Sequence, residues 1–246
     1  MYRYQILVEY VGTNFRGWQV QKKGKTIQGL IQEKLSKLLK EKIILFGSGR
    51  TDAGVHAIEQ SAHFECKQKI LKLEKFLKSI NHFLNSEGIS ITGIKKRNNN
   101  FHARFSAKLR IYRYIIINRI GRPVLDENRG WHIMNELDLN MMKKGAKKLV
   151  GTMDFSSFRA SSCRAKSPIK TMKSVKIYNS NEKIEIEFKS QSFLQHQVRS
   201  MVGCLKYLGE KKWTIKKFEN VLKSKKRTLC APPAPAEGLF LAKIIY

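Results

Sequence analysis

The sequence TIQGLIQEKLSKLL occupies residues 26–39 and has the pattern of an amphipathic helix. Thr26 can act as the N-cap, and apolar residues recur after it at helical spacing. The apolar stripe consists of Ile27, Leu30, Ile31, Leu35, Leu38 and Leu39. A helix of this kind buries its apolar face against another layer of structure. The stretch therefore predicts a helix packed on a sheet.

The segments around this helix supply that sheet. Strands are expected at residues 4–10, 43–46, 60–65 and 89–96, and a second helix at residues 71–84. The order is strand, helix, strand, strand, helix, strand. Such an order is typical of an α+β unit with helices covering a sheet.

The second half of the chain also contains both strands and helices. Strands are expected at 110–117, 169–178, 184–188 and 239–245, and helices at 138–150 and 196–208. In KIEIEFKS the alternation predicts that Ile184, Ile186 and Phe188 face a core while Lys183, Glu185 and Glu187 face water. We expect two α+β halves, residues 1–104 and 105–246.

The charge of the chain is strongly positive. It has 48 Lys and Arg against 19 Asp and Glu, a net charge of +29. Such a field attracts a polyanion, so nucleic acid is the expected partner, although a lysine excess from codon bias would look the same. The apolar runs are far shorter than the roughly 20 residues of a membrane span, and the N-terminus reads as a strand, not as a signal peptide. A cytoplasmic protein without a membrane span is expected.

The most informative loop is FGSGRTDAGVHA, residues 46–57. Its three glycines allow close approach of the backbone to a ligand, but no phosphate-loop or dinucleotide pattern is present. Asp52 lies two residues from Arg50, which could hold the carboxylate ionised as a nucleophile requires. The alternative is an Asx turn capped by arginine. Neither His56 nor His63 has the spacing of a metal ligand, and the four scattered cysteines show none either.

Two further stretches mix basic residues with aromatic or apolar ones. In FHARFSAKLRIYRYIIIN, residues 101–118, Tyr112 and Tyr114 fall on one strand face, where they can stack on bases or serve as core tyrosines. In SFLQHQVRSMVGCLKYLG, residues 192–209, Arg199 lies off the apolar stripe of a helix. It could meet a phosphate or a carboxylate, or be a solvated surface arginine.

Together these segments resemble the bacterial tRNA pseudouridine synthase A family. The similarity covers most of the chain and rests on six blocks in order. They are EYVGTNFRGWQVQ, GRTDAGVHA, FHARFSAKLRIYRY, DFSSFRA, HQVRSMVG and AEGLFLAKI. The aspartate loop is the most specific of these blocks.

The resemblance implies a fold of two ferredoxin-like halves whose sheets join around a central basic cleft. It implies Asp52 as the catalytic nucleophile, Arg50 as its ion-pair partner and Arg199 as a further active-site arginine. By the same resemblance Tyr112 stacks on the target uracil, and Leu239 forms an apolar wall for the base. It further implies a homodimer that converts uridines 38 to 40 of tRNA to pseudouridine without cofactor or metal.

Two other functions fit parts of the same pattern. A non-catalytic RNA-binding protein would use the basic residues without turnover. A nucleoside glycosidase would use the aspartate but release free base, and such enzymes usually carry a second carboxylate near the first. No motif supplies a carboxylate partner for Asp52.

Overall fold

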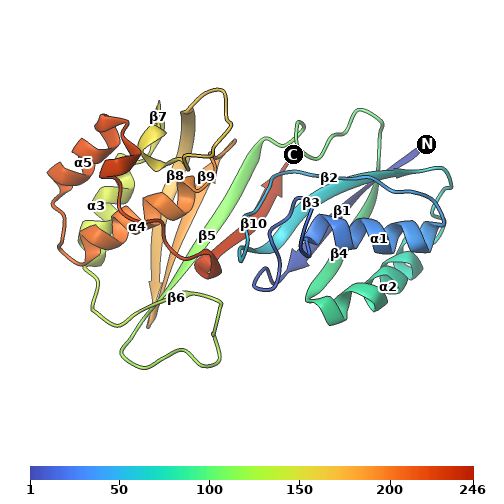
Figure 1. The fold of residues 1–246 in the computed structure, drawn as a ribbon, viewed down its shortest axis with the longest axis horizontal. Coiled ribbons are helices and arrows are strands. Elements are labelled where there is room, and N and C mark those ends of the chain that lie inside the picture. The colour runs from blue at the N-terminus through green and yellow to red at the C-terminus, as the bar shows by residue number, and fades with distance from the viewer. The chain divides into compact units, whose positions relative to one another are not determined.

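The computed structural model describes residues 1–246, which form two compact units. Unit 1 consists of Met1–Lys108 and Phe240–Tyr246, and unit 2 of Leu109–Leu239. Each unit contains helices and a sheet (Figure 1), so the expected α+β class is confirmed. The last strand, which we grouped with the second half of the chain, contributes all but its first residue to unit 1.

Unit 1 has the predicted order of elements. They are β1 (Tyr2–Tyr10), α1 (Ile27–Leu39), β2 (Leu45–Gly47), β3 (His56–Cys66), α2 (Leu73–Leu84), a 3-10 turn (Asn85–Glu87), β4 (Ile89–Arg97) and β10 (Leu239–Ile245). The strands β4, β1, β3 and β2 are neighbours in that order, and all three pairings are antiparallel. β10 lies parallel to β3 beside His56 and Ala57, so the sheet is mixed.

Local sequence explains the first helix. The Thr26 side chain accepts a hydrogen bond from the Gly29 N–H and caps α1, as predicted. Ile31 and Leu35 of the apolar stripe are fully buried, and so are Ile6 and Val8 of β1. Burial of each such side chain stabilises the fold by about 1.5 to 3 kcal/mol.

The strand faces opposite this apolar layer are covered by the segment 98–108. Gln5 of β1 pairs across the sheet with His63 of β3, and both are buried. The Nδ1 of His63 accepts a hydrogen bond of 3.1 Å from the Ala103 N–H. The hydroxyl of Tyr246 donates to the Ala103 carbonyl at 2.9 Å. These contacts bind the segment to the sheet.

The buried imidazole of His63 makes stability depend on pH. Burial, with the nearby His102 and Arg3, lowers the pKa of His63 from 6.5 to about 4, against the opposing effect of Glu65. The unfolded chain therefore binds a proton first as pH falls. We expect the free energy of unfolding to decrease from pH 6.5 to pH 4, by at most about 3 kcal/mol, in urea titrations. His63→Gln should flatten that slope, and an unchanged slope in the variant would contradict this assignment.

The strands of unit 2 include both antiparallel and parallel pairs. Its strands are β5 (Leu109–Asn118), β6 (Trp131–Ile133), β7 (Gly151–Asp154), β8 (Ile169–Ser180) and β9 (Lys183–Ser190). Its helices are α3 (Leu139–Lys148), α4 (Gln197–Gly209), α5 (Ile215–Ser224) and the 3-10 turns Ser156–Phe158, Arg227–Leu229 and Ala236–Gly238. β5, β9, β8 and β7 are antiparallel neighbours, and β6 runs parallel to β5. The three α-helices pack against one another.

One strand prediction is wrong in detail. On β9, Ile184, Ile186 and Phe188 are buried as expected, but Glu187 is buried as well, with 6% of its surface exposed. Its carboxylate lies 2.9 Å from the Lys189 ammonium, and Arg113 faces it on β5. A cation on the same strand, Lys189, and one on the neighbouring strand, Arg113, therefore replace the water that the alternating pattern predicted for this side chain.

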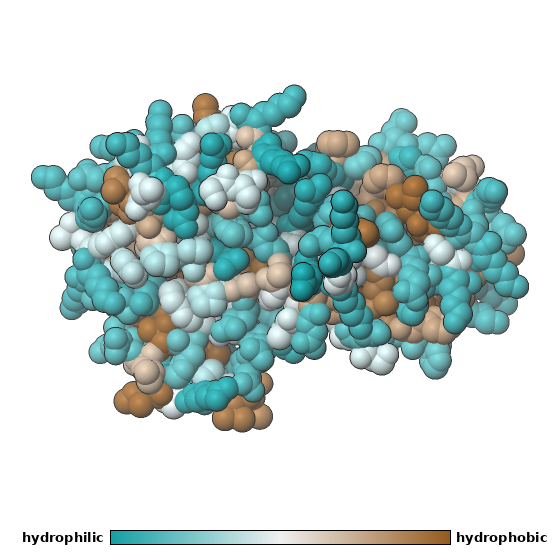
Figure 2. Space-filling model, in the orientation of Figure 1, coloured by the Kyte–Doolittle hydropathy of each residue, from teal (hydrophilic) through white to brown (hydrophobic).

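The surface is mainly polar. Figure 2 shows one face covered largely by hydrophilic side chains. Apolar side chains are nevertheless strongly exposed in the loop between β5 and β6, at Ile120, Val124 and Leu125. None of the helices has both the length and the apolar character needed to span a bilayer.

Candidate active site

The loop that carries Asp52 joins β2 to β3 and is held on both sides of that residue. On one side, the Thr51 carbonyl accepts a hydrogen bond of 3.1 Å from the Trp18 N–H, and the Thr51 hydroxyl lies 2.7 Å from that of Tyr10. On the other side, the Val55 N–H donates to the Asp52 carbonyl at 3.2 Å. The backbone around Asp52 is therefore fixed before substrate arrives.

Two glycines from the preceding segment allow this close packing. A Cβ on Gly12 would lie 2.0 Å from the Val55 carbonyl oxygen. A Cβ on Gly17, where φ is +86°, would lie 2.6 Å from the Thr51 carbonyl oxygen. Only glycine fits at either position, because backbone atoms of the loop occupy the space of a side chain.

Within this loop Asp52 is half-buried and Arg50 is exposed. Both side chains belong to unit 1 and are two residues apart. Their ion pair stays a prediction. The carboxylate belongs to a rigid loop, as a positioned nucleophile requires.

Tyr112 and Tyr114 follow each other on one face of β5 in unit 2. Tyr112 is 8% exposed, and its ring meets Phe193 edge-on, with 5.1 Å between the ring centres. Tyr114 is fully buried, and its hydroxyl donates to the Pro235 carbonyl at 2.8 Å. Burial raises the pKa of Tyr114, so it is a neutral structural phenol. The two tyrosines, which the sequence left equivalent, thus differ in environment.

Arg199 projects from α4 and is half-buried, so the solvated-surface alternative is wrong. Its Nε donates a 2.7 Å hydrogen bond to the Ala234 carbonyl, and the Ala234 N–H donates to the Arg199 carbonyl at 3.0 Å. One turn further on, a Cβ on Gly203 would lie 2.1 Å from the Pro232 carbonyl oxygen. The segment 232–234 therefore packs directly on α4 and orients the guanidinium.

Leu239 ends this segment and is 6% exposed. The preceding Gly238 lies against Tyr114, since a Cβ there would be 2.6 Å from the ring carbon that bears the hydroxyl. Residues 232–239 thus run from Arg199 to Tyr114 within unit 2. The structure brings Arg199, Leu239 and the β5 tyrosines into this unit and Arg50 and Asp52 into the other.

Sequence reasoning gave no weight to His196, the residue before α4. It adopts a left-handed conformation with φ of 62°, which is uncommon for a non-glycine residue. Phe193, the ring against Tyr112, also received no weight. No local pattern indicates either feature, because each depends on the turn that leads into α4.

Metal binding has no support from the side chains. No group of three or more His, Cys, Asp or Glu side chains is arranged to hold an ion. The four cysteines are not in disulfides, and the closest pair, Cys204 and Cys230, has its sulfur atoms 3.3 Å apart in unit 2. Burial raises the pKa of the Cys66 thiol to about 11, which leaves it protonated and unreactive at neutral pH.

Comparison with known proteins identifies the family. A family model described as tRNA pseudouridine synthase matches residues 6–106 and 146–246, so Tyr112 lies between the matched segments. The tRNA pseudouridine synthase A of Pelagibacter ubique (strain HTCC1062) is 71% identical over 246 residues, which is 100% of both chains. That of Paramagnetospirillum magneticum (strain ATCC 700264 / AMB-1) is 42% identical over 100% of this chain and 96% of its own. These matches confirm the resemblance found in the sequence, and the chain belongs to the tRNA pseudouridine synthase A family of isomerases.

Proposed function

We propose that this protein isomerises uridine to pseudouridine at positions 38 to 40 of the tRNA anticodon stem-loop, with Asp52 as the nucleophile. The observation that carries the proposal is the aspartate loop. A half-buried carboxylate lies on a backbone held in place on both sides, in a chain of this family. Such preorganisation is typical of a catalytic group rather than of a surface turn.

The reaction suits a site with one carboxylate and no cofactor. The N-glycosidic bond of uridine breaks, the uracil turns, and a carbon–carbon bond forms between its C5 and ribose C1′. C5 loses its hydrogen as a proton to solvent, N1 takes up a proton once its bond to C1′ is broken, and no electrons are gained or lost overall. Asp52 can attack ribose C1′ or C6 of the base, and either route keeps the fragments bound until they rejoin.

The other residues complete this site in the proposal. Arg50 pairs with the carboxylate, and Arg199 supplies a second cation. Tyr112 stacks on the uracil, and Leu239 forms an apolar wall beside it. Support comes from the orientation of Arg199 by Ala234 and from the ring packing of Tyr112 on Phe193. The architecture we propose is that of two ferredoxin-like halves, residues 1–104 and 105–246, joined around a basic cleft in a homodimer.

The target uridine must leave its stack before Asp52 can reach it. Flipping a base costs a few kcal/mol. Stacking on Tyr112 would recover about 1 to 3 kcal/mol of that cost. Contacts of Lys and Arg with phosphates supply the remaining affinity.

Release of tritium from tRNA labelled at uridine C5 tests the function directly. Isomerisation replaces the bond from C5 to hydrogen, so the wild-type protein should release tritium in proportion to the pseudouridine formed. A folded protein that binds several tRNAs and releases none would be a non-catalytic RNA-binding protein. Free uracil among the products would instead indicate a glycosidase.

The affinity for tRNA should depend steeply on salt. With a net charge of +29, the protein should displace several counterions from the RNA on binding. We expect the affinity to fall by at least about 100-fold between 0.05 and 0.2 M monovalent salt, measured by filter binding. A flat dependence would show that the basic excess contributes little to binding.

A further inference from the structure

Unit 1 exposes a group of aromatic rings that the proposed chemistry does not use. We call Phe46, His102 and Phe105 the aromatic platform. The ring centres of Phe46 and His102 are 5.8 Å apart, and those of His102 and Phe105 are 4.4 Å apart. Phe46 is 45% and Phe105 76% exposed. Clustered exposed rings of this kind commonly mark a binding surface.

The platform is rigid. Phe46 belongs to β2 and stacks on the buried His63 at 5.1 Å between ring centres. The turn from His102 to Ser106 is closed by two hydrogen bonds between these residues, of 2.9 and 3.0 Å. The Nδ1 of His102 also accepts a hydrogen bond from the Arg104 N–H at 3.1 Å. The rings are therefore presented without the entropy cost of ordering a loop on binding.

The charges near the platform favour an anion. The guanidinium of Arg104 lies 5.6 Å from the centre of the Phe105 ring, and that of Arg97 lies 4.7 Å from the centre of the Phe101 ring. Arg3 pairs with Glu65 on the same strand faces, so the nearby acidic group is already neutralised. Burial, together with Arg3 and Arg104, lowers the pKa of His102, which keeps its imidazole neutral at pH 7.

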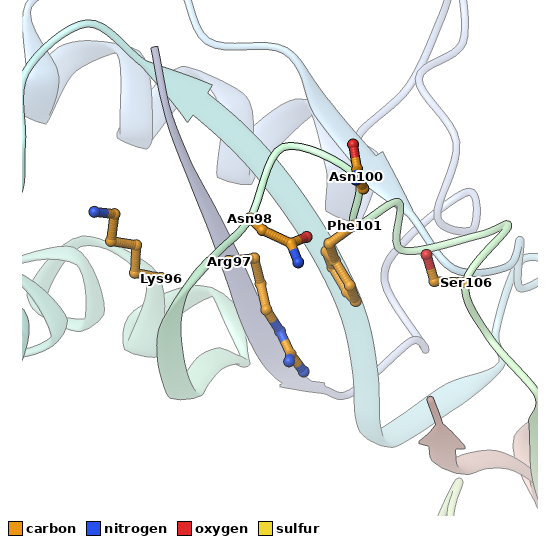
Figure 3. A pocket seen from close by; sticks show the side chains of 6 residues that line it. All are labelled: Lys96, Arg97, Asn98, Asn100, Phe101 and Ser106. Atoms are coloured by element: carbon orange, nitrogen blue, oxygen red, sulfur yellow. The ribbon is translucent and has the colours of Figure 1, made fainter.

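An open hollow lies beside the end of β4 and the segment that follows it. Its volume is about 410 Å³, and it is lined by Lys96, Arg97, Asn98, Asn100, Phe101 and Ser106. Figure 3 shows Arg97, Asn98 and Phe101 grouped beside the loop that follows β4. The volume is in the range of sites that hold small organic groups, about 300 to 1,000 Å³. Cationic and amide side chains at this place suit a phosphate and the polar edge of a base.

The platform is separate from the position of the target uridine. The Val55 N–H donates to Asp52 just before β3 begins at His56, whereas Phe46 pairs with His63, seven residues further along that strand. At about 3.3 Å per residue this places the platform roughly 20 Å from Asp52. A nucleotide on the platform is therefore not the one that reacts.

We propose that the aromatic platform binds an unpaired nucleotide of the substrate tRNA, with its base on Phe105 and Phe46 and its phosphate toward the hollow. The proposal rests on the proposed function for the identity of the RNA. Exposed rings flanked by guanidinium groups are the usual means of holding single-stranded nucleotides.

The test compares the affinities of variants for an unmodified tRNA transcript. Phe105→Ala should weaken binding about five-fold and Phe46→Ala/Phe105→Ala more than ten-fold, since stacking of one base is worth about 1 to 3 kcal/mol. Turnover at saturating tRNA should stay unchanged. In both ring variants, the slope of log affinity against log salt concentration should stay unchanged, because a ring neutralises no phosphate. Lys96→Gln should lower the magnitude of that slope by about 1. Phe105→Trp should retain affinity.

Tyr178→Ala is the matched control, because Tyr178 is 48% exposed on β8 of unit 2. Unchanged tRNA affinity in both platform variants would overturn the proposal, as would an equal loss in the Tyr178 variant. Unchanged affinity together with a shift in sedimentation would assign the platform to a protein interface instead. Affinity and tritium release are separate readouts, so a failure of this proposal can be told apart from a failure of the wild-type protein to release tritium.

Discussion

Asp52→Asn is expected to reduce tritium release from uridine-labelled tRNA by at least about ten-thousand-fold, an effect in the range seen when an enzyme loses its nucleophile. Asparagine keeps the size and the hydrogen-bonding geometry of the side chain but cannot attack carbon as a carboxylate does. The loop should stay in place, because its anchors are the Thr51 and Val55 backbone and the Thr51 hydroxyl. Affinity for tRNA should therefore change by no more than a few fold.

The control for this variant is Asp126→Asn, which removes a surface carboxylate that lies 2.8 Å from Lys183 in unit 2. Single-turnover rates and filter-binding titrations should be measured for both variants on the same tRNA. Intact turnover with weakened binding in Asp52→Asn would refute a catalytic role. If Asp52→Asn lost both turnover and tRNA binding but unfolded at the normal temperature, the carboxylate would serve substrate binding as well.

Elements with strong local patterns were predictable from the sequence. The apolar stripe behind Thr26 led to a helix that begins and ends within one residue of its expected bounds. The alternation in KIEIEFKS likewise identified β9. In these elements the spacing of apolar residues indicates which face meets the core, so distant contacts are not needed to recognise them, although the burial of Glu187 on β9 did not follow from it.

The elements that the sequence did not reveal are stabilised by distant contacts. α5 begins at the cap residue Thr214, yet only Phe218 and Val221 are buried in it, too few for a clear stripe. β6 and β7 have three and four residues, and each forms because a longer strand lies beside it. A pattern of so few residues does not separate a strand from a loop.

In the candidate site, too, some features follow from local sequence and others depend on distant contacts. The role of Asp52 was predicted from the resemblance of its loop to the aspartate loop of the family, whereas the loop's composition alone left an Asx turn open. The contact of Gly17 with Thr51 was not predictable, since it joins segments more than 30 residues apart. The orientation of Arg199 by Ala234 was missed for the same reason. Motifs predict which groups are candidates for the reaction, and long-range packing determines how those groups are held.

Gly17→Ala should therefore lower turnover at saturating tRNA by about 100-fold, the cost of displacing a catalytic group by about 1 Å. The new methyl group would lie 2.6 Å from the Thr51 carbonyl oxygen, 3.1 Å from the Asp52 carbonyl carbon and 3.2 Å from the Ala53 nitrogen. All three are backbone atoms, so no side-chain rotation relieves the contact. The loop must move, and the carboxylate moves with it. The positive φ adds a destabilisation of about 1 to 3 kcal/mol.

Variants of two other glycines separate the effect of moving the aspartate loop on turnover from the effect of a positive φ on stability. Gly24 also has a positive φ, of +91°, but its added methyl group would meet only the flexible side chain of Arg16. Gly24→Ala should therefore lower the free energy of unfolding without slowing turnover. Gly121 has no atom within 4 Å of an added Cβ, so Gly121→Ala should change neither quantity.

If Gly17→Ala turned over at the wild-type rate, or if Gly24→Ala lost as much activity, the position of the aspartate loop would not control the reaction. The expected result, slow turnover in Gly17→Ala alone, would show that a residue 35 positions away in the chain sets the geometry of Asp52.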